Sequence, residues 1–185
     1  MICGIDEAGR GPLAGPVTAA AVILPQGFDT SILDDSKKLR PAQRKRAASL
    51  ILESAAGFGI GWVWPHEIDT INIHYASLLA MKKAFEELTL LFGAAGIEKV
   101  LVDGKFTPAL SVAAEAIIKG DTFIPAIQAA SILAKEARDR WMIRYSWIEG
   151  GYGFEKHKGY PTKLHRQLCR ELGTSDIHRK SFRIL

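Results

Sequence analysis

The sequence has few of the features that mark exported, membrane-bound or zinc-finger proteins. It contains only two cysteines, Cys3 and Cys169, and no CxxC pair, which argues against a disulfide framework and a cysteine zinc site. No apolar run approaches the roughly 18 residues of a membrane span. Charged side chains interrupt the N-terminus where a signal peptide needs an apolar stretch. We therefore expect a soluble, cytoplasmic protein with no membrane association.

The length and composition predict an ordinary globular protein. The chain has 185 residues, of which 48% are hydrophobic and 24% are charged, so it has enough apolar side chains to bury a core. No internal repeat and no linker rich in glycine and serine divides it. We expect residues 1–185 to form one domain.

Charge is distributed unevenly along the chain. Residues 156–185 carry eight Lys or Arg against two acidic residues, a local net charge of +6, whereas the whole chain is only +4. A second basic cluster lies between residues 37 and 46. Two basic segments on a mildly acidic body indicate a polyanionic partner, and nucleic acid is the commonest one. The alternative is a solvated helix face and a basic C-terminal region without a partner.

Apolar periodicity predicts a mixed α/β fold. Two strands, over 2–6 and 17–24, are joined by a turn over 9–16 that contains glycine and proline, which indicates an opening hairpin. The later strands alternate with helices, so we expect a mixed sheet with helices packed on it. The other predicted strands are 58–64, 99–102 and 112–119, the last of which also fits a helix; the predicted helices are 41–54, one capped by Asp69 and running to Leu88, 129–147 and 162–172.

Carboxylates follow several of the apolar strands. Asp6 and Glu7 close the first strand, Asp103 ends a buried strand, and Asp121 follows a third apolar stretch. If these residues converge at one edge of the sheet, they form an oxygen-only site suited to Mg²⁺ or Mn²⁺. Two such ions can serve phosphodiester hydrolysis, which is the chemistry of a nuclease. The alternative is a set of solvent-exposed strand ends.

The neighbouring pair Asp6 and Glu7 poses a geometric difficulty. Adjacent residues in a regular strand point to opposite faces, so both can reach one metal ion only if the strand breaks there. Gly9 and Gly11 make such a break plausible.

Three further groups are candidate contacts to nucleic acid. Gly9, Arg10 and Gly11 leave backbone amides exposed in the turn, although a tight hairpin explains them equally well. Tyr160 lies among basic residues, where it can stack on a sugar or a base or anchor its loop to the core. Lys37 and Lys38 are candidate phosphate contacts, or part of a charged loop before a helix.

Other suggestive pairs are more simply explained by helix spacing. Ser131 and Lys135 stand four apart, without the spacing of an acylation motif, and an ion pair within the helix explains Lys135 with Asp139. His165 and Cys169, also four apart, are two metal donors without a third, which favours a pair on one helix face.

Six segments of the sequence, in order, resemble the ribonuclease HII family. The resemblance extends over nearly the whole chain and implies a mixed sheet flanked by helices, of the RNase H-like type, with a helical C-terminal region. The segments are Gly4–Pro12, Asp35–Leu39, Val102–Gly104, Ala130–Asp139, His157–Tyr160 and His178–Phe182.

The resemblance also implies an activity. Asp6, Glu7, Asp103 and Asp121 would be the catalytic residues and would hold two Mg²⁺ or Mn²⁺ ions. Gly9, Arg10 and Gly11, with Tyr160, would recognise the ribose 2′-hydroxyl. The enzyme would hydrolyse the RNA strand of RNA/DNA hybrids and cut on the 5′ side of ribonucleotides embedded in duplex DNA, leaving 5′-phosphate and 3′-hydroxyl ends.

Two other readings remain open at the level of sequence. Another metal-dependent nuclease of the same fold, acting on DNA, would share the carboxylates without needing the recognition residues. A nucleic-acid-binding module without catalytic activity would bind but not cut. No partner-binding tail is evident, so we expect a monomer.

Overall fold

The computed structural model describes residues 1–183, which are built around a five-stranded sheet with the strand order β3-β2-β1-β4-β5. The first three strands are antiparallel, whereas β4 runs parallel to β1 and β5 runs parallel to β4. The carboxyl ends of β1, β4 and β5 therefore meet at one edge of the sheet. The strands are β1 (Ile2–Ala8), β2 (Val17–Ile23), β3 (Gly57–Val63), β4 (Lys99–Asp103) and β5 (Ala114–Ile117).

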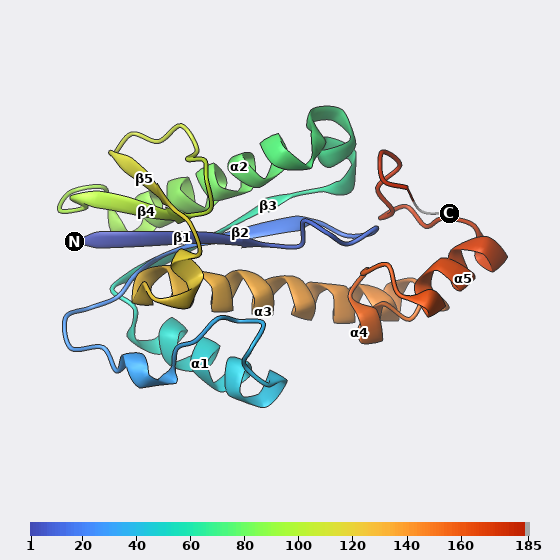
Figure 1. Ribbon diagram of the computed structural model, residues 1–185, viewed down its shortest axis with the longest axis horizontal. Helices are drawn as coiled ribbons and strands as arrows, with labels where there is room; N and C mark the ends of the chain where they lie inside the picture. Colours follow the sequence, from blue (N-terminus) through green and yellow to red (C-terminus); the bar gives the residue numbers. More distant parts are fainter. Residues whose placement is uncertain (184–185) are drawn as a thin grey trace.

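Helices cover both faces of the sheet (Figure 1). The long helix α2 (Pro65–Phe92) lies on one face, and α1 (Pro41–Ser54) and α3 (Pro125–Ile148) lie on the other. Within residues 1–183, no helix is both long and apolar enough to cross a bilayer. The remaining helices are the 3₁₀ turns η1 (Thr30–Ile32) and η2 (Gly120–Thr122), and α4 (Phe154–His157) and α5 (Lys163–Leu172) beyond the end of α3.

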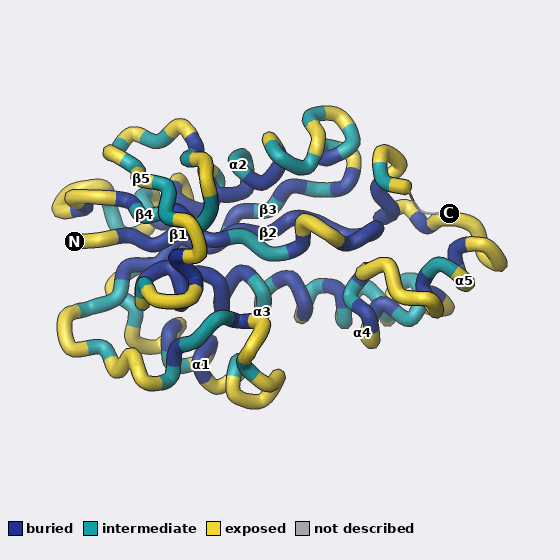
Figure 2. Tube along the Cα trace, in the orientation of Figure 1, coloured by how far each residue is buried: buried dark blue, intermediate teal, exposed yellow. Residues whose placement is uncertain are grey.

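The sheet separates two apolar cores, and alternation along β2 supplies both. Ala19, Ala21 and Ile23 pack in the core under α2, whereas Ala20 and Val22 pack in the core formed with α1 and α3. Period-two alternation of this kind is what a strand buried on both faces requires. Figure 2 shows the result as a band of buried residues along the strands and the sheet-facing side of α3.

Helix α3 approaches β1 so closely that one strand position must be glycine. A Cβ added to Gly4 would lie 2.2 Å from the backbone carbon of Ala126. Gly4 therefore faces α3, and so does Asp6, two residues further along the same strand.

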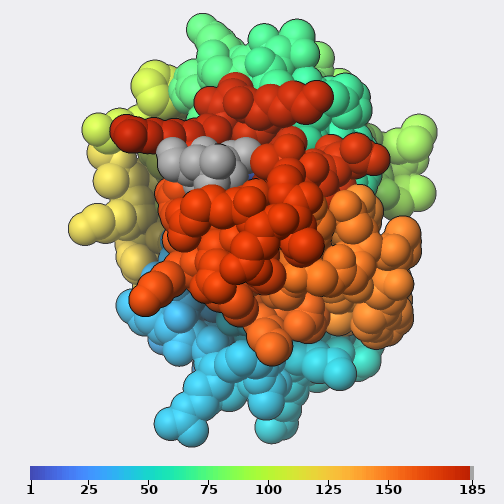
Figure 3. Space-filling view, turned by 90° about the vertical axis from the view of Figure 1, so that its right-hand side faces the viewer, coloured from blue at the N-terminus to red at the C-terminus, as the bar shows by residue number. Residues whose placement is uncertain are grey.

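The residues after α3 form a third, smaller core at the far end of the molecule. Met142 of α3 packs with Tyr152, Phe154 and Ile177, and Ala14 of the opening turn completes the cluster. The C-terminal segment that follows α3 covers this end of the molecule in Figure 3.

The predicted fold class is confirmed, but the start of the second helix is not. Helix α2 begins at Pro65 and is interrupted at Asn72, whose φ is 62°. The Asn72 carboxamide oxygen accepts hydrogen bonds from the N–H groups of His74 and Tyr75 and so caps the longer part of the helix. The predicted cap, Asp69, instead accepts hydrogen bonds from the backbone N–H groups of Lys180 and Ser181.

Candidate active site

Three of the four predicted carboxylates meet at the shared edge of β1, β4 and β5. Asp6 lies near the end of β1, Asp103 is the last residue of β4, and Asp121 lies in η2, just after β5. One side-chain oxygen from each lies within 4.8 Å of the others, a spacing that suits a single cation. The backbone N–H of Asp121 also donates to Oδ1 of Asp103 at 3.3 Å. This convergence follows from the parallel pairing of the three strands.

Glu7 points to the other face of the sheet. Strand β1 continues through Ala8 without the predicted break, because Asp6 and Glu7 pair in regular register with Ala20 and Ala19. Glu7 therefore lies outside the three-carboxylate group. Its Oε1 is 3.2 Å from Nη1 of Arg10, and it shares a small pocket of about 80 Å³ with Asp103 on the α2 side. Asp103 thus belongs to the three-carboxylate group and also lies beside Glu7.

The carboxylates repel one another in a poorly solvated place. Burial, followed by repulsion from Glu7 and Asp103, raises the pKa of Asp6 above its ordinary value. Burial also raises the pKa of Glu7, although the Arg10 guanidinium opposes the shift. The pKa of Asp103 is raised by burial and by the charge of Asp121. A divalent cation would relieve this repulsion, and an all-oxygen donor set is the kind that Mg²⁺ and Mn²⁺ prefer.

The predicted recognition residues line one cleft together with Glu7. A cleft of about 470 Å³ is lined by Glu7, the turn of Gly9, Arg10 and Gly11, and Tyr160. Gly9 has a φ of 94°, a conformation that favours glycine. A Cβ on Gly11 would lie 3.8 Å from Cε1 of Tyr160, so the turn and the aromatic ring form adjoining walls.

The two predicted lysines have different surroundings. Lys37 lines the cleft, and its Nζ lies 3.5 Å from Oδ2 of Asp121, which brings a cation to the edge of the carboxylate cluster. Lys38 pairs instead with Asp34 at 3.7 Å and does not line the cleft. The sequence offered no means of separating these neighbours.

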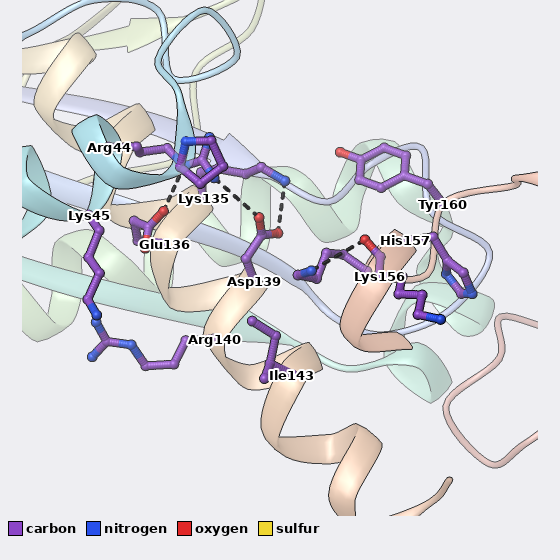
Figure 4. A pocket seen from close by; sticks show the side chains of 12 residues that line it. Arg44, Lys45, Lys135, Glu136, Asp139, Arg140, Ile143, Lys156, His157 and Tyr160 are labelled. Atoms are coloured by element: carbon purple, nitrogen blue, oxygen red, sulfur yellow. Dashed lines mark hydrogen bonds and ion pairs between the residues drawn. The ribbon is translucent and has the colours of Figure 1, made fainter. Parts of the chain in front are cut away.

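A basic groove continues the cleft along α1, α3 and α4. It has a volume of about 620 Å³ and shares Tyr160 with the cleft. Its two carboxylates are already paired, because Arg44 Nε lies 2.7 Å from Glu136 and Lys135 Nζ lies 2.8 Å from Asp139 (Figure 4). Among the described residues, four other Lys or Arg side chains that line the groove form no ion pair: Lys45, Arg140, Lys156 and Lys158. The groove therefore presents surplus positive charge.

The structure confirms the helical ion pair of Lys135 with Asp139 and adds a role for Lys135. The Lys135 ammonium also lies 5.4 Å from the centre of the Tyr160 ring, a cation–π distance. Ser131, set aside as a helix-face residue, is buried, and its hydroxyl lies 2.9 Å from that of Ser36 beneath the cleft.

His178 lies beside His165 and Cys169 and supplies the third possible metal donor that the sequence lacked. The three side chains are instead joined by hydrogen bonds. Nε2 of His178 lies 3.0 Å from Nε2 of His165 and 3.2 Å from Sγ of Cys169. The backbone N–H of Ser175 donates to Nδ1 of His178 at 2.9 Å, so the proton of the neutral ring is on Nε2. That nitrogen therefore donates to His165 and has no lone pair left for a metal ion.

Sequence reasoning missed two arginines that bind the turn over residues 9–16, which we call the recognition turn. Arg138 and Arg179 are fully buried and bind carbonyl groups of residues 9–16. A signal for Arg138 was present, because it follows Ala130 and Ala134 at spacings of four on the buried face of α3. No comparable local pattern marks Arg179.

Comparison with known proteins gives one consistent family. The family model described as Ribonuclease HII matches residues 3–184. A protein of Treponema denticola called Ribonuclease HII is 52% identical over 98% of this chain and 98% of its own length. Another, from Moorella thermoacetica, is 48% identical over 98% of this chain and 86% of its own length.

A solved structure agrees with the observed fold. The RNase HII in the PCNA:RNase HII complex from Archaeoglobus fulgidus superimposes with a TM-score of 0.76 and 25% sequence identity. The match covers 99% of this chain and 95% of that chain. The mixed sheet with its flanking helices is therefore the RNase H-like fold.

Proposed function

The chain belongs to the ribonuclease HII family of metal-dependent endoribonucleases acting on RNA/DNA hybrids, and from this we propose that it also cuts duplex DNA on the 5′ side of an embedded ribonucleotide. One observation carries the proposal: the turn of Gly9, Arg10 and Gly11 lines one cleft with Tyr160 and Lys37, and the Lys37 ammonium lies 3.5 Å from Asp121 of the carboxylate cluster. A phosphodiester placed against the carboxylates would bring the adjoining ribose next to the turn.

The carboxylates would hold the metal ions. Asp6, Asp103 and Asp121 supply oxygen donors within 4.8 Å of one another, and Glu7 borders Asp103 on the opposite face of the sheet. This arrangement supports two ion positions that share Asp103. When bound, two Mg²⁺ or Mn²⁺ ions activate the attacking water and stabilise the departing 3′ oxygen, which gives 5′-phosphate and 3′-hydroxyl products.

The turn and Tyr160 would distinguish ribose from deoxyribose. Only RNA offers a 2′-hydroxyl, which both donates and accepts hydrogen bonds. The exposed backbone of Arg10 and Gly11, which follow the buried Gly9, can bind that hydroxyl, while the Tyr160 ring stacks on the sugar. Lys135 and Arg138 lie 5.4 Å and 5.9 Å from the centre of the ring and keep it in place.

Basic side chains would hold the phosphate backbone without reading sequence. Lys37, at the edge of the carboxylate cluster, would contact a phosphate near the cut, and Lys38 one further away. The groove that contains Lys45, Arg140 and Lys156 would guide the duplex beyond the cleft (Figure 4).

We also propose that residues 1–185 act as one domain and that the chain works as a monomer in the cytoplasm. The third core supports the first part, because it joins residues of α3, the opening turn and the C-terminal region. Sedimentation equilibrium tests the second, since a molecular mass near 20.3 kDa is expected for a monomer. A mass near twice that value would contradict it.

The central experiment uses two labelled duplexes that differ in one 2′-hydroxyl. One contains a single ribonucleotide and the other is all DNA, and each is incubated with Mg²⁺, with Mn²⁺ or with chelator. We expect cutting only on the 5′ side of the ribonucleotide and only with metal, leaving a 5′-phosphate on the downstream fragment. Cutting of both duplexes would favour a general nuclease, and binding without cutting would favour a non-catalytic module.

The role of Tyr160 is tested by a pair of variants. Tyr160→Ala should lower cutting of the single-ribonucleotide duplex by about 10- to 100-fold, because a stacking contact contributes roughly 1–3 kcal/mol. Tyr160→Phe keeps the ring and should retain most of the activity. Equal activity in Tyr160→Ala and the unaltered protein would refute the recognition role.

The phosphate contacts are tested by the salt dependence of binding in chelator. Lys37→Ala should weaken binding to both duplexes and lower the slope of log K against log salt by about 1. Lys38→Ala should have a smaller effect, because its ammonium is already paired with Asp34. Lys82→Ala, on the outer side of α2, is the control. A Lys37→Ala variant with the same slope as the control would contradict the phosphate contact.

A further inference from the structure

Two arginines are buried in the interior without a carboxylate partner. Arg138 of α3 and Arg179 of the C-terminal region are both 0% exposed. Among residues 1–183, neither takes part in an ion pair. Burying a guanidinium is costly unless its donors are hydrogen-bonded. Their partners must therefore account for their presence in the interior.

Almost all of these partners are carbonyl groups of the recognition turn. Arg138 donates to the carbonyls of Ala14 and Pro16 at 3.0 and 2.8 Å, and to that of Lys158 at 3.0 Å. Arg179 donates to the carbonyls of Gly9, Arg10 and Gly15 at 2.6, 3.0 and 2.9 Å. The backbone N–H of Arg179 also donates to the carbonyl of Leu13 at 2.8 Å. The carbonyl groups of the turn are thus held by hydrogen bonds from the protein interior.

These hydrogen bonds to the carbonyls set the direction of the N–H groups in the turn. A trans peptide unit is planar, and its C=O and N–H point in opposite directions. Because the Gly9 carbonyl faces Arg179, the N–H of Arg10 points away from it. The Arg10 carbonyl likewise directs the N–H of Gly11 outward. Both residues are exposed and line the cleft, and within the described chain neither N–H donates to another group.

We propose that Arg138 and Arg179 are positioning residues. Arg179 holds the carbonyls of Gly9 and Arg10 inward so that the N–H groups of Arg10 and Gly11 face the ribonucleotide, and Arg138 fixes the later part of the same turn at Ala14 and Pro16. The inference rests on the proposed function for the identity of the ligand. Neither arginine touches the substrate; each acts through the backbone of residues 9–16.

The chemistry of arginine fits this task better than that of lysine. A guanidinium is a planar fork of five N–H donors, so one side chain can hold three separate carbonyls, whereas an ammonium is a single point of charge. Burial lowers the pKa of Arg138 to about 10 and, with the charge of Arg138, that of Arg179 to about 9. Both side chains therefore stay protonated at neutral pH and keep all of their donors.

Glycine in the turn is part of the same arrangement. A Cβ on Gly9 would lie 2.2 Å from Nε of Arg138. The arginine side chain thus occupies the space that any larger residue would need. The absence of a side chain at Gly9 lets the guanidinium approach the backbone closely.

The proposal is tested by variants that keep the charge and remove the fork. Arg138→Lys and Arg179→Lys are compared with Arg144→Lys, an exposed position on α3. Affinity is measured in chelator for the single-ribonucleotide duplex and for the all-DNA duplex. We expect the preference for the ribonucleotide to fall by about 10- to 100-fold in the two test variants, as for small misplacements of binding groups. Affinity for the all-DNA duplex should be unchanged.

The ratio of affinities separates positioning from a loss of structure. General destabilisation would weaken binding to both duplexes alike and leave their ratio unchanged. An unchanged ratio in both folded variants would overturn the proposal. If the lysine variants do not fold, the unaltered protein gives a second test by amide NMR. Adding the single-ribonucleotide duplex in chelator should shift the signals of Arg10 and Gly11, and static signals would overturn the proposal.

Failure of the proposed function would be recognised separately. In that case the unaltered protein would neither cut nor prefer the single-ribonucleotide duplex. The arginine assignment is then judged in the free protein from the amide signals of Gly9, Arg10 and Gly11. These signals should move in Arg179→Lys and stay in place in Arg144→Lys. Equal spectra for the two variants would refute the positioning role.

Discussion

The carboxylate cluster and the buried arginine pair both place like charges close together in a poorly solvated region. The two regions differ in how those charges are stabilised. Burial and mutual repulsion raise the pKa of Asp6 and Asp103, although the backbone N–H groups of Glu7 and Asp121 donate to these two carboxylates. Arg138 and Arg179 also have shifted pKa values, but each donates three hydrogen bonds to neutral carbonyls. Repulsion that persists despite these hydrogen bonds favours the binding of a cation, whereas fully bonded donors favour a structural role.

The largest expected effect is the loss of cleavage when a residue of the carboxylate cluster is changed. Asp103→Asn should lower the cleavage rate by on the order of 10³-fold, because Asp103 borders both carboxylate groups. Binding of a hybrid duplex should survive. Measured in chelator, the free energy of unfolding should stay equal or rise, because one repelling charge is lost. Glu53→Gln, on the exposed side of α1, is the control for activity. Cleavage at the control rate would count against the metal assignment.

A mutation in the arginine pair should lower the free energy of unfolding, in contrast to Asp103→Asn. Arg179→Gln leaves buried carbonyls without donors, so the free energy of unfolding should fall by about 3 kcal/mol. Urea denaturation in chelator measures both variants under the same conditions. If Asp103→Asn were destabilised as much as Arg179→Gln, the proposed contrast between the two regions would be wrong.

A divalent cation should stabilise only the acidic region. At a concentration of Mg²⁺ or Mn²⁺ a hundred times the dissociation constant, binding to the folded state adds about 2.7 kcal/mol. The melting temperature of the unaltered protein should therefore rise with added metal, and that of Asp103→Asn should rise much less. Calorimetric scans at increasing metal concentration measure both. Equal shifts would indicate that the cations bind elsewhere.

The smallest effect concerns pH and the histidine cluster behind the arginine pair. Burial, followed by the neighbouring His165, lowers the pKa of His178 to about 4 from 6.5. Between these values the unfolded chain binds more protons than the folded one, so stability is present above pH 6.5 and is lost as the pH falls toward 4. The loss should be about 1 kcal/mol between pH 7 and pH 5.5.

Urea denaturation across this pH range measures the slope. His178→Gln should flatten it, whereas His66→Gln, at an exposed position of α2, should leave it unchanged. His178 is faced by His165, Cys169 and Ser175, and by the ring of Tyr152, whose centre lies 5.3 Å from that of the imidazole. His165 and His157 also have lowered pKa values through burial and contribute in the same direction. A slope that is the same in both variants would contradict the assignment to His178.

The sequence was most informative where function depends on alternation and strand ends. Asp6 and Asp103 were predicted from buried strands that end in carboxylates, and parallel pairing brings them together. Alternation also raised the difficulty over Glu7, and the structure gives its physical answer: β1 continues unbroken and directs Glu7 to the opposite face. These features are local in sequence, which is why a single chain reveals them.

The features that sequence reasoning missed depend on distant partners. Asp69 looked like a helix cap, but its hydrogen bonds go to residues more than a hundred positions away. Lys37 and Lys38 are neighbours with equal charge, and only the folded chain shows which one approaches Asp121. Arg179 binds carbonyls near the other end of the chain. No periodic pattern encodes such pairings.

The hydrogen bonds of Arg179 also bear on the order in which the protein matures during synthesis. They span 164 to 170 residues, almost the full chain, and ribosomes release residues from the N-terminus onward. The strands that carry Asp6 and Asp103 emerge long before Arg179 does. A nascent chain can therefore form the strands that carry Asp6 and Asp103 while the turn that we propose recognises ribose still lacks the hydrogen bonds of Arg179.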